Sequence, residues 1–342
     1  MTEEMKPEKR ELTGRFFSLR WQWHDFWDTD PDRSIAMIEE AIGIAEQLEQ
    51  PIWVMECRHW LAQAIVFKKR DYARGLPLVV QSAVDASKPT FQGWRTRICL
   101  YQDLIAAYIG ADAISNATII ENALSRMQAE SPPEAQCTRC LLGERTSFEL
   151  KQHNLEYARL SAQTYLSKSN EPHHQSQAQA YIAHLSFLSE DWKATLKHAE
   201  AAEKLGSEAD NQDIVVEALI HQAIAHLKLG DLNVAKACFS RSEAQRSLYG
   251  ITLDIQYWNT RVAYFEALND LDSAISSRKA HLDAIAGHGA LREEAEALID
   301  LCRLQKQVGG IAPETIQKAQ TAISALKIPA DLPIKLAQIT ER

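Results

Sequence analysis

The sequence has few of the residues that interrupt helices. Its 342 residues include 13 Gly and 11 Pro, whereas Ala, Leu, Glu, Gln, Lys and Arg, which lose least entropy in a helix, are abundant. Hydrophobic residues make up 46% and charged residues 24% of the chain, as in folded soluble proteins rather than disordered ones. The composition therefore predicts an all-α protein.

Long basic runs and long apolar runs are also missing. The net charge is −9, which repels phosphate, and the longest basic run is Lys68-Lys69-Arg70, so no nucleic-acid partner is expected. The segment from Met1 to Arg10 is charged and has no apolar core of a secretory signal. No stretch approaches the ~20 apolar residues that cross a bilayer. We expect neither export nor a membrane partner.

The six cysteines are scattered, unlike the dense disulfide framework of a small secreted domain. This spacing favours a reducing, cytoplasmic location. One pair, Cys137 and Cys140, forms a C-x-x-C motif, but a structural zinc site needs a second Cys or His pair and a redox site needs a βαβ context. Two buried small side chains are the simpler interpretation, and a metal or redox role stays open.

Motifs of catalysis are missing as well. The sequence has no phosphate-binding loop, no dinucleotide-binding glycine pattern, no H-E-x-x-H and no G-x-S-x-G. His221 and His226 are five residues apart, whereas metal-binding pairs on a helix are three or four apart. We therefore expect no enzyme activity, no cofactor and no metal site.

The sequence does contain a repeated motif. From Ala218 to Ala235 an amphipathic helix runs to Gly230, a tight turn follows at Asp231, and a second helix begins. Similar motifs recur along the chain, with turns at positions 71, 111, 154, 191, 231, 270 and 310. These turns are 37 to 43 residues apart, and a fixed period of this length is typical of repeat proteins.

Each residue type in the motif has a physical role. A Gly or Asn that closes the first helix can adopt the left-handed conformation, and the following Asp can cap the next helix. Small residues such as Ala223, Ala235 and Ala274 allow paired helices to approach closely. A single hairpin cannot cover its own apolar stripe, so neighbouring hairpins are expected to stack into one array.

The run from Glu217 to Phe239 resembles the tetratricopeptide signature, with Ala223, Gly230-Asp231 and Ala235 at the offsets that the signature uses. The period near 40 exceeds the usual 34, and is similar to the extended repeats of bacterial maltose-regulator-like proteins, peptide-pheromone receptors and signalling adaptors. The resemblance implies a right-handed α-α superhelix of about eight antiparallel helix pairs, whose concave face binds a peptide, a protein or an effector.

We expect one array over residues 1–342, with an aromatic capping hairpin at 1–50 and capping helices at 311–342. In tetratricopeptide arrays the first helix of each pair lines the inner face. Carrying that register onto this sequence gives a set of predicted partner-binding residues: Trp60, Phe67, Gln177, His184, Phe187, Glu217, Ile220, Ile224, Gln256, Asn259 and Glu266.

The segment from Arg15 to Trp27 is unusually aromatic. Its rings cannot all lie on one helical stripe, so some should face outward, and exposed aromatics beside Arg are typical of interaction surfaces. A buried end cap and a partner-binding surface are both open for four residues in particular: Phe16, Trp21, Trp23 and Trp27.

These patterns predict a cytoplasmic scaffold or adaptor that binds a protein or peptide. The alternative is a regulator whose superhelix responds to a bound peptide or small molecule. The sequence leaves the oligomeric state open.

Overall fold

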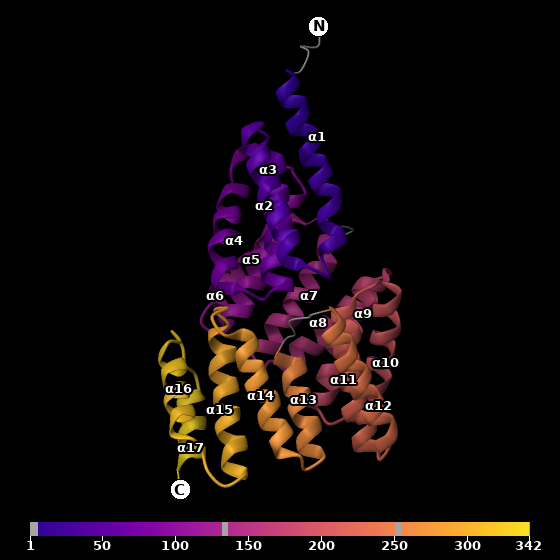
Figure 1. Cartoon of the computed structure of the whole chain (residues 1–342), viewed down its shortest axis with the longest axis vertical. Helices are drawn as coiled ribbons and strands as arrows, with labels where there is room; N and C mark the ends of the chain where they lie inside the picture. Colours follow the sequence, from indigo (N-terminus) through magenta and orange to yellow (C-terminus); the bar gives the residue numbers. More distant parts are fainter. Residues whose placement is uncertain (1–5, 132–135, 250–254, 342) are drawn as a thin grey trace.

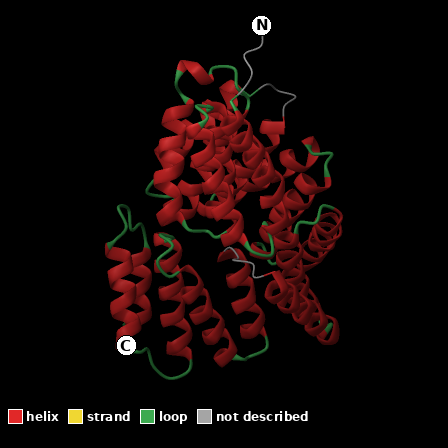
Figure 2. Ribbon diagram, turned by 45° about the horizontal axis from the view of Figure 1, so that its top comes forward, coloured by secondary structure: helices red, strands yellow, loops and turns green. Residues whose placement is uncertain are grey.

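The computed structural model describes residues 6–131, 136–249 and 255–341, and the described chain is helical throughout with no strand (Figures 1 and 2). The first half contains α1 (Pro7–Gln22), α2 (Pro31–Gln47), α3 (Pro51–Ala62), α4 (Tyr72–Ala86), α5 (Thr96–Asp112), α6 (Ala117–Glu130), α7 (Gln136–Lys151) and α8 (Leu155–Lys168). The second half contains α9 (Pro172–Leu188), α10 (Trp192–Glu208), α11 (Gln212–Leu229), α12 (Leu232–Tyr249), α13 (Ile255–Ala267), α14 (Leu271–Ile285), α15 (Leu291–Gln307), α16 (Pro313–Ser324) and α17 (Leu332–Thr340).

Consecutive helices pack in pairs, and each pair packs against the next. The order α1·α2 to α15·α16 gives the eight predicted pairs, and α17 follows them and packs on α15 and α16. The prediction of an all-α superhelix of stacked helix pairs is therefore confirmed. The division into an array with two caps stays a prediction.

The turns inside the pairs have the geometry that their residues favour. Gly230 and Asn269 close their helices in the left-handed region, with φ of 96° and 57°. The carboxylates of Asp71, Asp191 and Asp270 each accept a hydrogen bond from the backbone N–H three residues later, at 3.0 Å. These bonds satisfy amide groups that a helix start would otherwise leave unpaired.

Small residues separate the paired helices as expected. Ala223, Ala235 and Ala274 have no exposed surface, and Trp258, 4% exposed, belongs to the same core cluster as Ala223 and Ala235. Because a larger side chain at these alanines has no room, the helix pairs are held at one separation.

One predicted turn is wrong. The sequence suggested that a helix ends at Gly110-Ala111, but α5 continues to Asp112. The glycine makes room for a neighbouring ring, because a Cβ at Gly110 would lie 2.0 Å from Cζ of Tyr72. Asp112 makes the turn instead, accepting hydrogen bonds from the backbone N–H groups of Ile114 and Ser115, both at 3.1 Å.

The helix that follows α3 is of a rarer kind. Gln63–Lys68 (η2) is a π-helix, which continues α3 with a wider turn. As a result the Asp71 N–H bonds to the carbonyl of Ile65, six residues back, whereas Asp191 and Asp270 bond five residues back. Short π-helical segments often occur at functional sites.

The late helices of the superhelix contact the early ones. The Ala73 N–H donates to the His288 carbonyl at 2.9 Å, and the Arg292 guanidinium pairs with Asp112 at 2.6 Å. Arg70 pairs with Glu293 at 3.4 Å. We call these three contacts the seam. Because the seam joins segments that are 180 to 223 residues apart, the helices between them surround a central space.

Candidate functional site

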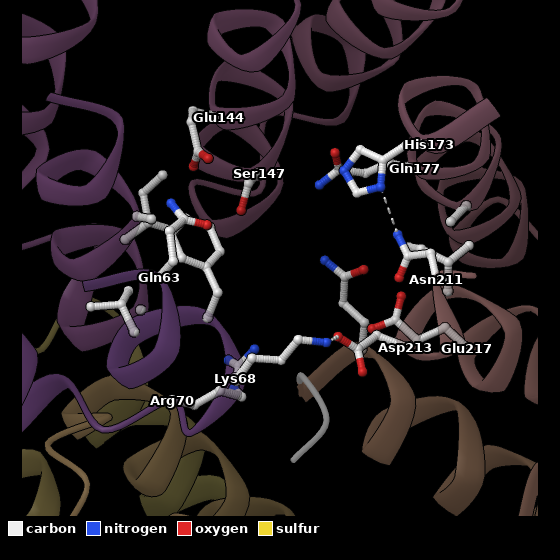
Figure 3. A pocket seen from close by; sticks show the side chains of 18 of the residues that line it. Gln63, Lys68, Arg70, Glu144, Ser147, His173, Gln177, Asn211, Asp213 and Glu217 are labelled. Atoms are coloured by element: carbon white, nitrogen blue, oxygen red, sulfur yellow. Dashed lines mark hydrogen bonds and ion pairs between the residues drawn. The ribbon is translucent and has the colours of Figure 1, made fainter. Parts of the chain in front are cut away.

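The central space is a cavity of about 460 Å³. Its first wall consists of η2, α5 and α7, and its second wall consists of the starts of α9, α11 and α13 (Figure 3). Trp27 and Asp28, from the turn before α2, also reach it. The cavity therefore lies between the early and late pairs.

The first wall presents the middle and the carboxyl-terminal halves of its helices. Phe67 and Lys68 come from η2, Gln102 and Ile109 from α5, and Glu144 from the second half of α7. The π-helix contributes directly, because four of its six residues line the cavity: Gln63, Val66, Phe67 and Lys68.

The second wall presents the opposite ends of its helices. His173 and Gln177 come from the start of α9, Asp213 and Glu217 from the start of α11, and Gln256 from the start of α13. The Asn211 side chain, just before α11, lies 3.4 Å from Nδ1 of His173 (Figure 3). Burial lowers the pKa of His173, so this imidazole is neutral at pH 7.

An ion pair crosses the cavity between the walls. The Lys68 ammonium lies 2.9 Å from an Asp213 carboxylate oxygen (Figure 3). It also lies 2.6 Å from the Asp28 carboxylate. Burial disfavours the charged lysine, but Asp213 and Asp28 outweigh it and raise the pKa of Lys68. The lysine is therefore charged and engaged with both carboxylates.

Amide side chains are as frequent on the walls as carboxylates, with five of each. They come from both sides of the cavity and from five different places along the chain: Gln63, Gln102, Gln177, Asn211 and Gln256. Each amide carries both a donor and an acceptor. Such a lining suits a ligand that also carries both, as a peptide backbone does.

The predicted inner-face residues separate into two groups. Four of them line the cavity: Phe67, Gln177, Glu217 and Gln256. In α11, which has Glu217 at the cavity, Ile220 and Ile224 are fully buried against Tyr257 and Trp258. The placement of these two isoleucines on the inner surface was wrong, because the next helix pair covers that part of α11.

The other five predicted inner-face residues are also absent from the cavity lining: Trp60, His184, Phe187, Asn259 and Glu266. His184 is buried and its Nδ1 lies 3.2 Å from Nε2 of His221, and Phe187 stacks on His184. Asn259 is exposed and accepts a hydrogen bond from Arg278, and Glu266 pairs with Arg303.

The amino-terminal aromatics also differ from one another. Trp23 and Phe16 are buried, with 0% and 1% exposed, so they pack as a core and cannot contact a partner. Trp21 is 80% exposed, and Trp27 lines the cavity, with Trp60 packed edge-on against it at 5.7 Å between ring centroids. The partner-binding prediction is therefore wrong for Phe16 and Trp23 and stays a prediction for Trp21 and Trp27.

None of the cysteines whose side chains are described lines the cavity. Cys140 is half-buried and packs against the core formed by α5 and α6, and the side chain of Cys137 lies outside the described residues. No three His, Cys, Asp or Glu side chains are grouped to hold a metal ion in the part of the chain that is described. No described helix is long and apolar enough to cross a membrane.

Several lining residues were missed from the sequence. Lys68, Glu144, Asn211 and Asp213 are all at the cavity, but none occupied a position that the repeat register marked. The signal that could have found Lys68 is the basic run itself, which is three residues long and lies at the turn inside one of the clearest repeats.

No protein-family model matches this sequence, and no curated protein matches it. Among solved structures, a Rap protein complexed with competence and sporulation factor has a TM-score of 0.59 and 12% identity, over 97% of this chain and 99% of that one. The APC/C hetero-tetramer Cut9-Hcn1 aligns over 89% of this chain and 59% of that one, with a TM-score of 0.35 and 12% identity. The TPR domain of P58(IPK) aligns over 97% of both chains, with a TM-score of 0.23 and 12% identity. The similarity to the Rap protein is one of fold, a superhelix of stacked helix pairs.

Proposed function

We propose that this protein is a non-catalytic scaffold or adaptor that binds a peptide, or an extended segment of a partner protein, in its central cavity. The observation that carries the proposal is the amide lining on both walls of the cavity. A volume of about 460 Å³ lies within the roughly 300–1,000 Å³ of small-ligand sites. It admits a short extended segment rather than a folded domain.

Two further observations support a binding role. The Rap protein of similar fold was solved with a factor bound. Cys57, Cys238 and Cys302 are buried thiols, which suits the reducing cytoplasm that we propose as its location. The net charge of −9 disfavours nucleic acid as the partner.

Pooled pentapeptides equilibrated with the protein test this function. We expect a subset to be retained, and the double variant Gln177→Ala with Asn211→Ala to retain it about tenfold less, since each lost hydrogen bond contributes roughly 0.5–1.5 kcal/mol. Gln163→Ala with Asn170→Ala removes two exposed amides at α8 and its end, and serves as the matched control. Equal loss in both variants, or no retained peptide, would count against the cavity as the binding site.

A ligand-sensing regulator is the second candidate, because one residue belongs to both the cavity and the seam. Arg70 lines the cavity and pairs with Glu293 across the seam. A ligand that contacts Arg70 could therefore change the contact between α15 and the early helices. Hydrogen exchange at the Ala73 N–H, which bonds to His288, distinguishes the two: a change of protection with bound peptide favours the regulator, and unchanged protection favours the scaffold.

A further inference from the structure

The Glu144 carboxyl group is a buried acidic group that points into the cavity (Figure 3). The residue is 8% exposed, and Oε1 accepts a hydrogen bond from the Gln102 amide at 3.1 Å. No hydrogen-bond partner of Oε2 occurs among the residues that the structure describes. One face of the carboxylate is therefore held by α5, and the other faces the space in which a ligand would lie.

The cations of the cavity are engaged elsewhere. Lys68 pairs with Asp28 and Asp213, while Arg70 and Lys151 both reach Glu293, at 3.4 Å and 3.9 Å. In the described part of the chain no Lys, Arg or His forms an ion pair with Glu144. Removal of a carboxylate from water costs free energy unless a positive charge accompanies it.

The charges around Glu144 add to this cost. Burial first, and then the nearby Asp103 carboxylate, raise the pKa of Glu144 to about 7, against the opposing hydrogen bond from Gln102. Asp103 is itself fully buried and is held by His59 at 2.8 Å and by Gln63 at 2.6 Å. The cavity lining as a whole is acidic, with five carboxylates and three basic side chains (Asp28, Glu144, Asp210, Asp213 and Glu217; Lys68, Arg70 and Lys151).

We infer that Glu144 anchors an organic ammonium group of the cavity's ligand, either a lysine side chain of a peptide or a free polyamine. An ammonium group supplies the missing positive charge and donates to the open carboxylate oxygen, and a charge-assisted hydrogen bond of this kind is about twice as strong as a neutral one. Phe67 and Trp27 line the same cavity and offer apolar surface for the methylene chain that carries the ammonium. The inference rests on the proposed function in taking this cavity as the binding site.

Retention of defined probes tests the inference. Two pooled pentapeptide libraries with acetylated amino ends are compared, one with lysine and one with norleucine at a fixed position, together with spermidine and an uncharged polyether of similar length. The variant Glu144→Gln keeps the shape and can still accept from Gln102. Glu149→Gln is the matched control, since Glu149 is equally buried, at 9% exposed, on the same helix and is absent from the cavity lining.

We expect lysine peptides or spermidine to be retained over their uncharged counterparts, and this preference to fall about 30-fold in Glu144→Gln and to persist in Glu149→Gln. Retention of lysine peptides identifies a peptide as the source. Retention of spermidine without any peptide supports the ammonium anchor while overturning the proposed peptide-binding function.

Norleucine peptides retained as well as lysine peptides would overturn the inference and leave peptide binding intact. So would a preference for lysine that persists in Glu144→Gln. No retained probe at all would overturn both proposals. The comparison of lysine with norleucine needs no variant, so it decides the question even if Glu144→Gln does not fold.

Discussion

The two walls of the cavity use the same kind of helix in opposite ways. In the first wall, η2, α5 and α7 turn mainly their carboxyl-terminal halves to the cavity, with Phe67 and Glu144 among the contacts. In the second wall, α9, α11 and α13 turn their amino-terminal halves to it, with Gln177 and Glu217 among the contacts. Yet all six segments belong to the first helices of their pairs.

The difference follows from the advance of the superhelix. Each helix pair is displaced relative to the previous pair. The carboxyl-terminal ends of the early helices therefore lie at the same level of the cavity as the amino-terminal ends of the late helices. The remainder of each late helix is then covered by the next pair, as α13 covers Ile220 of α11. A repeat register therefore identifies a face of each helix, whereas the superhelix decides which half of that face a ligand can reach.

The largest expected effect is at the seam, which joins the first wall to α15. Arg292 and Asp112 are 6% and 4% exposed and form a pair at 2.6 Å, and loss of one partner leaves the other buried and unpaired. Arg292→Ala should lower the free energy of unfolding in urea by about 3–5 kcal/mol. Lys335→Ala breaks an exposed pair with Asp331 and should cost no more than about 1 kcal/mol. Equal costs would show that the seam does not hold the walls together.

A pair of variants on α11 compares how much its two halves contribute to stability. Ile220→Ala removes a fully buried side chain and should cost about 2–5 kcal/mol of stability. Glu217→Ala, at the cavity, should change stability by less than about 1 kcal/mol, since its side chain is half-buried and polar. Thermal or urea unfolding of both variants checks this, and the reverse order would place Ile220 at the cavity after all.

The pH dependence of stability tests the first wall at Glu144. Its folded pKa of about 7 lies above the usual 4.5, so between these values the folded state keeps a proton that the unfolded state has released. Stability should therefore fall as pH rises through this window, by up to about 3 kcal/mol. Glu144→Gln should be relatively more stable than the natural chain at pH 8 than at pH 5. Parallel pH profiles for the two proteins would contradict the raised pKa.

The smallest effect on stability is expected at an exposed residue of the aromatic amino-terminal segment. Trp21 is 80% exposed, so Trp21→Ala should change stability by no more than about 0.5 kcal/mol. Trp23→Ala, two residues away and fully buried, is the contrasting variant and should cost about 3–5 kcal/mol. A large loss from Trp21→Ala would mean that this ring packs against the protein and is unavailable to a partner.

Most of the fold could be predicted because its signals are local. The turn chemistry of Gly230, Asp191 and Asp270 and the alanines between helices are set by residues a few positions apart. Gly110 misled the prediction because its role is to admit the Tyr72 ring from another helix. The π-helix at Gln63–Lys68 was missed, because it differs from an α-helix in its hydrogen bonding and not in a recognisable residue motif.

The candidate site was only partly predictable. Phe67, Gln177, Glu217 and Gln256 followed from the repeat register, since they lie on the correct face and in the correct half. Lys68 and Asp213 meet because the chain closes after 145 residues, and no local pattern contains that closure. Glu144 carries no motif, and its importance comes from burial without a counter-ion.

The claim that only one half of each wall helix reaches the cavity is tested most directly by photo-crosslinking. A crosslinking side chain is placed at two positions that the repeat register predicted to be equivalent. Phe67 is 36% exposed and lines the cavity, whereas Phe187 stacks on the buried His184 near the end of α9. With retained peptide bound, a benzophenone at position 67 should crosslink to the peptide and one at position 187 should not. Crosslinking from position 187, or equally from both positions, would contradict the arrangement of the two walls.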